Sequence, residues 1–154
     1  MGSDVRADGG CPYPAFRAAG RRPHASECFG VSAALEPDMA AYAECWNAAR
    51  FFEAHETLEP RWIRERDPGL QALIQLAAAL HHLTRANVRG ARTMLDRCLA
   101  RFESAGSASY PIDVSEMASY ARRVRREAGN SDHATLIEQR PRIGEAPARE
   151  TPIP

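Results

Sequence analysis

Hydrophobic positions in the middle of the chain recur every three or four residues, which is the spacing of amphipathic helices. Residues 37–49 form the first predicted helix, opened by a proline that suits a first helical turn. The second predicted helix carries residues 51–63. Pro60 lies inside it and lacks a backbone donor, so a kink or restart is expected within residues 56–61, while the apolar face continues beyond.

The third predicted helix, residues 68–86, is the most apolar segment of the chain. Asp67 and Pro68 combine an N-cap acceptor with a proline at the first helical position. The apolar residues, which cover about half of the circumference or more, are Leu70, Leu73, Ile74, Leu76, Ala77, Leu80 and Leu83. An arc this wide is typical of a central helix, so the other helices are expected to pack around it.

Two further helices follow, and each has a recognisable start and end. The fourth is predicted to begin at Asn87 or Gly90 and to close at Gly106, with an apolar stripe opposite arginines. The fifth begins after Asp113, which has a glutamate three residues later as in a capping box, and ends at Gly129. These signals separate the helices by short loops.

The two ends of the chain lack a sustained period and are rich in glycine and proline. Residues 1–36 are expected to be a disordered extension, and residues 129–154 a mostly disordered tail with one short turn around residues 133–138. No alternating strand pattern occurs. The sequence therefore predicts an all-α domain over residues 37–128, an antiparallel bundle of about five helices around the central apolar helix.

The composition is that of a small soluble protein. The chain has 154 residues, 44% of them hydrophobic, and 20 basic residues balance 20 acidic ones, so no overall charge attracts nucleic acid. No apolar run is long enough for a membrane helix and no secretory signal opens the chain, so a cytoplasmic location is expected. The cysteines have no metal-site spacing, and Cys98, which lies among apolar residues, is interpreted as a buried structural thiol.

The second helix has an apolar arc that holds two polar residues. The arc consists of Phe51, Phe52, Leu58, Trp62 and Ile63. His55 and Glu59 fall in its middle at 100° per residue, so both are expected to point into the core. A buried carboxylate must be hydrogen-bonded, paired or bound to a metal, because an unpaired one costs several kcal/mol.

One hypothesis is a divalent-metal or small-ligand site with hydrolase-like activity. His55 and Glu59 are one turn apart and can share an ion, with Glu56 and His82 completing the set. The segment differs from the zinc-protease pattern His-Glu-x-x-His, because Glu59 takes the place of the second histidine. A ferritin-like di-iron site is excluded, since no histidine of these two helices has a glutamate three residues before it.

A second hypothesis, which we favour, is a buried hydrogen-bonded network that fixes the register of the second and third helices. Its members are His55, Glu59, Trp62, Gln75 and His82, because indole, imidazole and amide groups are the partners that a core carboxylate needs. The protein is then a binding or scaffold module whose function lies on its surface. Its partners stay open, and a second copy of the chain is one candidate.

A third hypothesis is nucleic-acid binding through the arginines near the end of the fifth helix, which are Arg122, Arg123, Arg125 and Arg126. Zero net charge and the absence of interleaved aromatic residues argue against it. Cations near a helix C-terminus also complement the helix dipole without any partner. Patterns for a serine nucleophile or a phosphate-binding loop are absent from the sequence.

Three motifs in a fixed order resemble one known family. They are Phe52-Glu53-Ala54-His55-Glu56-x-Leu58-Glu59-x-x-Trp62, Leu70-Gln71-x-Leu73-Ile74-Gln75-Leu76-Ala77-Ala78-Ala79-Leu80-x-His82, and Asn87-x-x-Gly90-Ala91. Over about residues 40–127 the chain resembles the domain-of-unknown-function family 309, which comprises small all-helical bacterial and archaeal proteins. The resemblance implies an all-α bundle and supplies no reaction. It places the family's polar signature on His55, Glu56, Glu59, Trp62, Gln75, His82 and Asn87. The chain departs from the family pattern at Pro60, where a helical residue is usual, and at Ala48-Ala49-Arg50, where a glycine is common.

Overall fold

The computed structural model describes residues 35–106 and 112–144, which form six helices and no strand. The helices are α1 (Pro37–Asn47), α2 (Phe51–Glu65), α3 (Pro68–Thr84), α4 (Val88–Ala105), α5 (Val114–Glu127) and α6 (His133–Glu138). The predicted all-α class is confirmed. None of these helices is both long and apolar enough to cross a membrane. Most of the predicted extension, residues 1–34, lies outside the described residues, as do Cys11 and Cys28.

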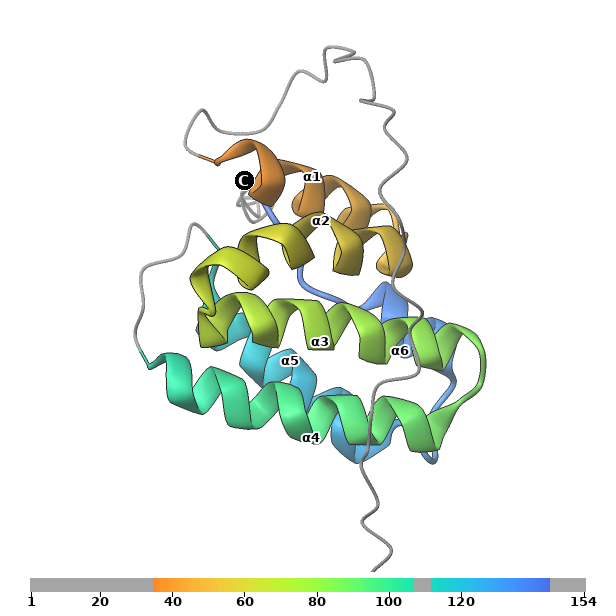
Figure 1. Cartoon of the computed structure of the whole chain (residues 1–154). Helices are drawn as coiled ribbons and strands as arrows, with labels where there is room; N and C mark the ends of the chain where they lie inside the picture. The colour runs from red at the N-terminus through yellow and green to blue at the C-terminus, as the bar shows by residue number, and fades with distance from the viewer. Residues whose placement is uncertain (1–34, 107–111, 145–154) are drawn as a thin grey trace, which may run out of the picture.

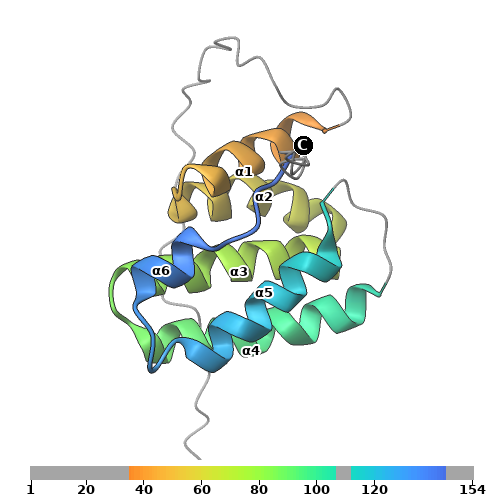
Figure 2. The ribbon, with the colours of Figure 1, turned by 180° about the vertical axis from the view of Figure 1, so that it is seen from behind.

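Helices α1 to α4 lie side by side in one antiparallel layer (Figure 1). Seen from behind, α5 and α6 cover the other face of this layer, with α5 against α4 and α6 against α3 (Figure 2). Ten of the 17 residues of α3 are buried, because α3 has neighbours on both sides within the layer and another behind it. This confirms the central helix that the wide apolar arc predicts.

Side-chain caps fix three of the helix starts, and the sequence predicts two of these caps, at Asp67 and Asp113. The Asp67 carboxylate accepts hydrogen bonds from the backbone N–H groups of Gly69 and Leu70, at 2.7 and 3.0 Å. Asn87 caps α4 and Asp113 caps α5 in the same manner. Each cap satisfies backbone donors of the first turn that have no partner inside the helix, which sets where the helix begins.

Helix α2 runs through Pro60 as one helix, so it does not restart within residues 56–61, and its expected continuation beyond Pro60 is confirmed. Pro60 is exposed, so water can solvate the carbonyl of Glu56 that lacks its helical donor. The turn before α2 uses Ala49 at a φ of 58°, a left-handed conformation that favours glycine.

The predicted tail from residue 129 is wrong for residues 129–144, because this segment is part of the packed domain. It contains α6, and the side chains of Leu136 and Ile143 are buried. The chain after α6 crosses the back of the layer toward α1 (Figure 2). The predicted boundary at residue 128 therefore falls inside the domain, and the short turn predicted at residues 133–138 is confirmed as α6.

Arg140 joins this C-terminal segment to the end of α1. Its guanidinium is buried and donates to the carbonyls of Trp46, Asn47 and Ile137, and it lies 5.6 Å from the centre of the Phe51 ring. The carbonyls of Trp46 and Asn47 lie at the C-terminal end of a helix, where the helix dipole favours a cation as a hydrogen-bond donor.

The cysteines among the described residues are structural, as predicted. Cys98 is fully buried in the core and Cys45 is nearly so, and neither forms a disulfide. Burial raises the pKa of the Cys98 thiol, so this side chain stays a neutral hydrophobic group.

Candidate functional site

The core-facing side of α2 differs from the predicted arc. Its buried residues are Phe51, Ala54 and Leu58, which recur at spacings of three and four residues. Phe52 and Ile63, which were placed in the core, are 42% and 53% exposed. Ala54 takes the buried position because its small side chain allows close packing with the neighbouring helices. The helix is therefore turned about its axis relative to the prediction, and its polar motif faces outward.

The seven residues of the predicted polar signature lie at the surface or near it. Glu56 and Asn87 are exposed, whereas the half-buried ones are His55, Glu59, Trp62, Gln75 and His82. The network is therefore only partly buried: Trp62 packs against the core and the atoms His55 Nδ1 and Gln75 Oε1 are shielded from solvent, but none of the seven side chains is fully enclosed. A carboxylate that reaches solvent needs no buried partner.

The exposed side of α2 combines acidic and apolar side chains. We call this surface the α2 outer face and define it as Phe52, Glu53, Glu56, Glu59 and Ile63. Phe52, Glu56, Glu59 and Ile63 follow one another at spacings of four, three and four residues, so they form one stripe along the helix. Phe52 and Ile63 are the exposed large hydrophobic residues of the described part of the chain.

Phe52 lies between two histidines at the start of α2. Its ring centre is 6.2 Å from that of His55 and 5.5 Å from that of His81 on α3. Burial, together with the positive charges of Arg85 and His82, lowers the pKa of His81. The imidazole of His81 is therefore neutral at pH 7, which suits its packing against an aromatic ring.

His82, Asn87 and Gly90 meet at the corner between α3 and α4. The Asn87 side-chain oxygen accepts from the Gly90 N–H at 2.9 Å, and its amide nitrogen lies 3.2 Å from His82 Nδ1. A Cβ on residue 90 would come within 2.7 Å of the Asn87 amide nitrogen and 2.9 Å of His82 Nδ1. These three members of the family-like motifs therefore connect two helices, and their role at this corner is structural.

The predicted metal ligands do not form a metal site among the described residues. In residues 35–106 and 112–144, no group of three or more His, Cys, Asp or Glu side chains is arranged so that it could hold an ion. His82 is engaged with Asn87 at the α3–α4 corner, and Glu59 has no hydrogen bond or ion pair within the described part. The geometry therefore favours contact with another molecule over ligand chemistry at His55, Glu59 and His82.

The comparison with protein families agrees with this segment of the chain. Residues 39–94 match the family described as Domain of unknown function (DUF309). The resemblance predicted from the sequence is therefore confirmed for this segment of the chain. The match covers α1 to α3 and the first part of α4, and it ends before the expected limit near residue 127. Neither the curated proteins nor the solved structures contain a match to this chain.

The DUF309 segment contains every residue of the predicted polar signature. Gly90, at the corner between α3 and α4, provides a first test of the structural role of this corner. Gly90→Ala is expected to lower the free energy of unfolding by about 1 kcal/mol, although alanine is the better helix former, because the new Cβ displaces the Asn87 cap. In an Asn87→Ala background the same change is expected to cost less, since the cap is already absent and only the close approach to His82 Nδ1 remains. Urea unfolding of the four variants measures this difference.

The same series has a direct control at a neighbouring position. Arg89 is exposed on the first turn of α4, and Arg89→Ala is expected to change stability by less than about 0.5 kcal/mol in either background. Equal effects of Gly90→Ala with and without the Asn87 side chain would contradict the structural role of this corner.

Outside the DUF309 segment, the arginines of α5 are largely engaged within the protein. Arg125 forms a bidentate pair with Asp96 of α4, with N–O distances of 2.6 and 3.3 Å. Arg123 donates to the Gln139 carbonyl and lies over the Tyr120 ring, while Arg126 is 3.7 Å from Glu127. These contacts attach α5 to α4 and to the C-terminal segment, so the geometry gives the nucleic-acid hypothesis no support.

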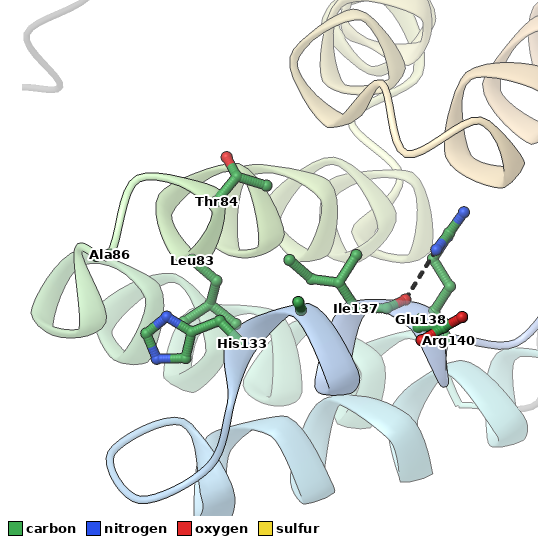
Figure 3. Close-up of a pocket in the computed structure, with 8 residues that line it drawn as sticks. Leu83, Thr84, Ala86, His133, Ile137, Glu138 and Arg140 are labelled. Atoms are coloured by element: carbon green, nitrogen blue, oxygen red, sulfur yellow. Dashed lines mark hydrogen bonds between the residues drawn. The ribbon is translucent and has the colours of Figure 1, made fainter.

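A surface pocket of about 580 Å³ lies between the end of α3 and α6. Leu83, Ala86, Ala134 and Ile137 supply apolar lining, and His133 and Arg140 stand at opposite ends (Figure 3). His133 Nε2 is 2.9 Å from the Ala128 carbonyl, and the Arg140 guanidinium is bonded to three carbonyls. The ionisable groups at its ends therefore serve the fold, and the pocket offers little specific chemistry.

Proposed function

We propose that this protein is a binding module and that the α2 outer face is its contact surface. The observation that supports this proposal is the orientation of α2. Its core contacts are made by Phe51, Ala54 and Leu58, which leaves Phe52 and Ile63 largely exposed. Large apolar side chains grouped on one side of a helix and flanked by polar residues mark surfaces that bind other macromolecules.

The position of the surface in the domain supports the same role. Helix α2 lies in the layer between α1 and α3 (Figure 1), so its backbone is held on both sides by packed helices. Arg61 on the α1 side forms ion pairs with Glu36, Asp38 and Glu65, which anchors α2 to the start of α1. A surface on a fixed helix loses little conformational entropy when a partner binds.

Photocrosslinking on the full chain in its native cells tests the proposal. A benzoylphenylalanine at position 52 or 63 is expected to give one discrete adduct with a partner that mass spectrometry identifies. The same group at Thr93 or Arg101, which are exposed on α4, serves as the matched control and is expected to give none. Phe52 and Ile63 share one face, so both positions are expected to capture the same partner.

A second set of variants links the adduct to this surface. Glu56→Arg with Glu59→Arg reverses two charges of the α2 outer face without touching the core and is expected to abolish the adduct from position 52. Adducts that form equally at the α4 control positions, or that survive this charge reversal, would overturn the proposed function.

A further inference from the structure

The apolar and acidic groups of the α2 outer face have a regular order. Phe52 and Ile63 are eleven residues apart, which places them on one side of the helix about 16 Å from each other. Glu56 and Glu59 lie between them, and Glu53 lies beside Phe52. A partner that covers this face therefore meets an apolar side chain at each end and negative charge in the middle.

The carboxylates in the middle of this face have no basic partner among the described residues. Glu56 and Glu59 form no ion pair there, whereas three acidic residues on the α1 side of α2 surround Arg61. Covering these two carboxylates with an apolar surface removes water from them without compensation. A partner of complementary charge avoids this penalty and gains selectivity.

Two other occupants fit less well. A second copy of α2, packed antiparallel on the first, places Phe52 against Ile63 but brings Glu56 and Glu59 of one copy against Glu59 and Glu56 of the other. A nucleic acid meets negative charge at the centre of the face, which repels its phosphates. The spacing of four, three and four residues is the one that a second helix matches, as in coiled coils.

We propose that the α2 outer face binds a basic amphipathic helix of a partner protein, with two apolar residues three turns apart and arginine or lysine between them. The apolar residues cover Phe52 and Ile63, and the basic residues pair with Glu56 and Glu59. This inference rests on the proposed function and adds the chemistry of the partner.

Three synthetic helical peptides test the charge selection. They share leucines at positions 1 and 12 and differ at positions 5 and 8, which are arginine, glutamine or glutamate. Binding to the full ¹⁵N-labelled protein is followed by NMR. The arginine peptide is expected to shift the amide signals of residues 52–63 and to bind about tenfold more tightly than the glutamine peptide. The glutamate peptide is expected not to bind. Added salt is expected to weaken the binding of the arginine peptide more than that of the glutamine peptide.

Two variants assign the contacts. Glu56→Gln with Glu59→Gln is expected to weaken the arginine peptide about tenfold and to leave the glutamine peptide unchanged. Phe52→Ser is expected to weaken both peptides. Equal binding of the arginine and glutamine peptides, binding that shifts other helices, or no binding at all would overturn the basic-helix inference. A different result would overturn the proposed function itself, namely the failure of crosslinks to form at positions 52 and 63.

Discussion

A chain that ends at Ala128 is expected to lose its cooperative thermal transition. The shortened chain lacks Leu136 and Ile143, each worth about 1.5–3 kcal/mol of apolar burial, and exposes the indole of Trp46, which donates to the Pro141 carbonyl at 2.8 Å. The summed loss is about 5 kcal/mol or more, which is comparable to the whole stability of a small domain. Circular dichroism melts of the full and shortened chains measure the effect.

Single substitutions in the same segment separate specific contacts from chain length. Arg140→Met removes the guanidinium that bonds the end of α1, and a loss of about 2–3 kcal/mol is expected because the carbonyls of Trp46, Asn47 and Ile137 each lose a hydrogen bond from a charged donor. Glu138→Ala, at an exposed position two residues away, is expected to change stability by less than about 0.5 kcal/mol. A cooperative melt of the shortened chain near the temperature of the full chain would refute the boundary assigned here.

Leu58→Ala is expected to destabilise the domain by about 2–5 kcal/mol, whereas Glu59→Gln on the next residue changes stability by less than about 0.5 kcal/mol. Leu58 is fully buried, so its truncation leaves a cavity against the neighbouring helices. Glu59 is half-exposed and forms no ion pair among the described residues. Urea unfolding of the two variants measures this difference, and the thermal midpoint of Leu58→Ala is expected to fall by roughly 10 °C or more.

The comparison of Leu58→Ala with Glu59→Gln also decides whether the polar motif of α2 lies at the surface or in a core network. If Glu59→Gln destabilised the protein as much as Leu58→Ala, the motif of α2 would be part of the core after all. Glu56→Gln, at a fully exposed position of the same face, provides the reference for a change of charge alone.

The helix starts could be predicted because their chemistry is local. Asp67, Asn87 and Asp113 each cap a backbone that lies two or three residues away, so a short stretch of sequence contains both donor and acceptor. The central position of α3 could be predicted for a similar reason. Its apolar arc is wide enough that no rotation of the helix would expose it fully.

The rotation of α2 could not be predicted from periodicity alone. Two apolar sets overlap on this helix, and the larger side chains of Phe52 and Ile63 carried more weight than the single methyl of Ala54. The packing of neighbours against Ala54 decides the orientation, because a small residue lets two helices approach closely. The predicted burial of His55 and Glu59 depends on the set that contains Phe52 and Ile63, which does not face the core.

The short turn at residues 133–138 has a local signal, but the packing of residues 129–144 on the other helices has none. Arg140 contacts residues that precede it by more than ninety positions, and nothing in the adjacent sequence indicates which carbonyls it will meet. Prolines and the lack of a helical period are also compatible with an irregular segment that packs across the other helices. The sequence therefore predicts the start of a helix more reliably than the segment that packs against that helix.

The distance in sequence between Arg140 and α1 has a consequence for the synthesis of the protein. Helix α1 leaves the ribosome early, but the arginines that donate to the carbonyls of Trp46 and Asn47 follow only with residues 140–142. Until then the end of α1 lacks these charged donors, and the aromatic ring of Trp46 lacks the acceptor for its indole N–H. The nascent chain therefore completes its core only when translation has passed residue 143, and α1, the first of the described helices to be made, is among the last to be secured.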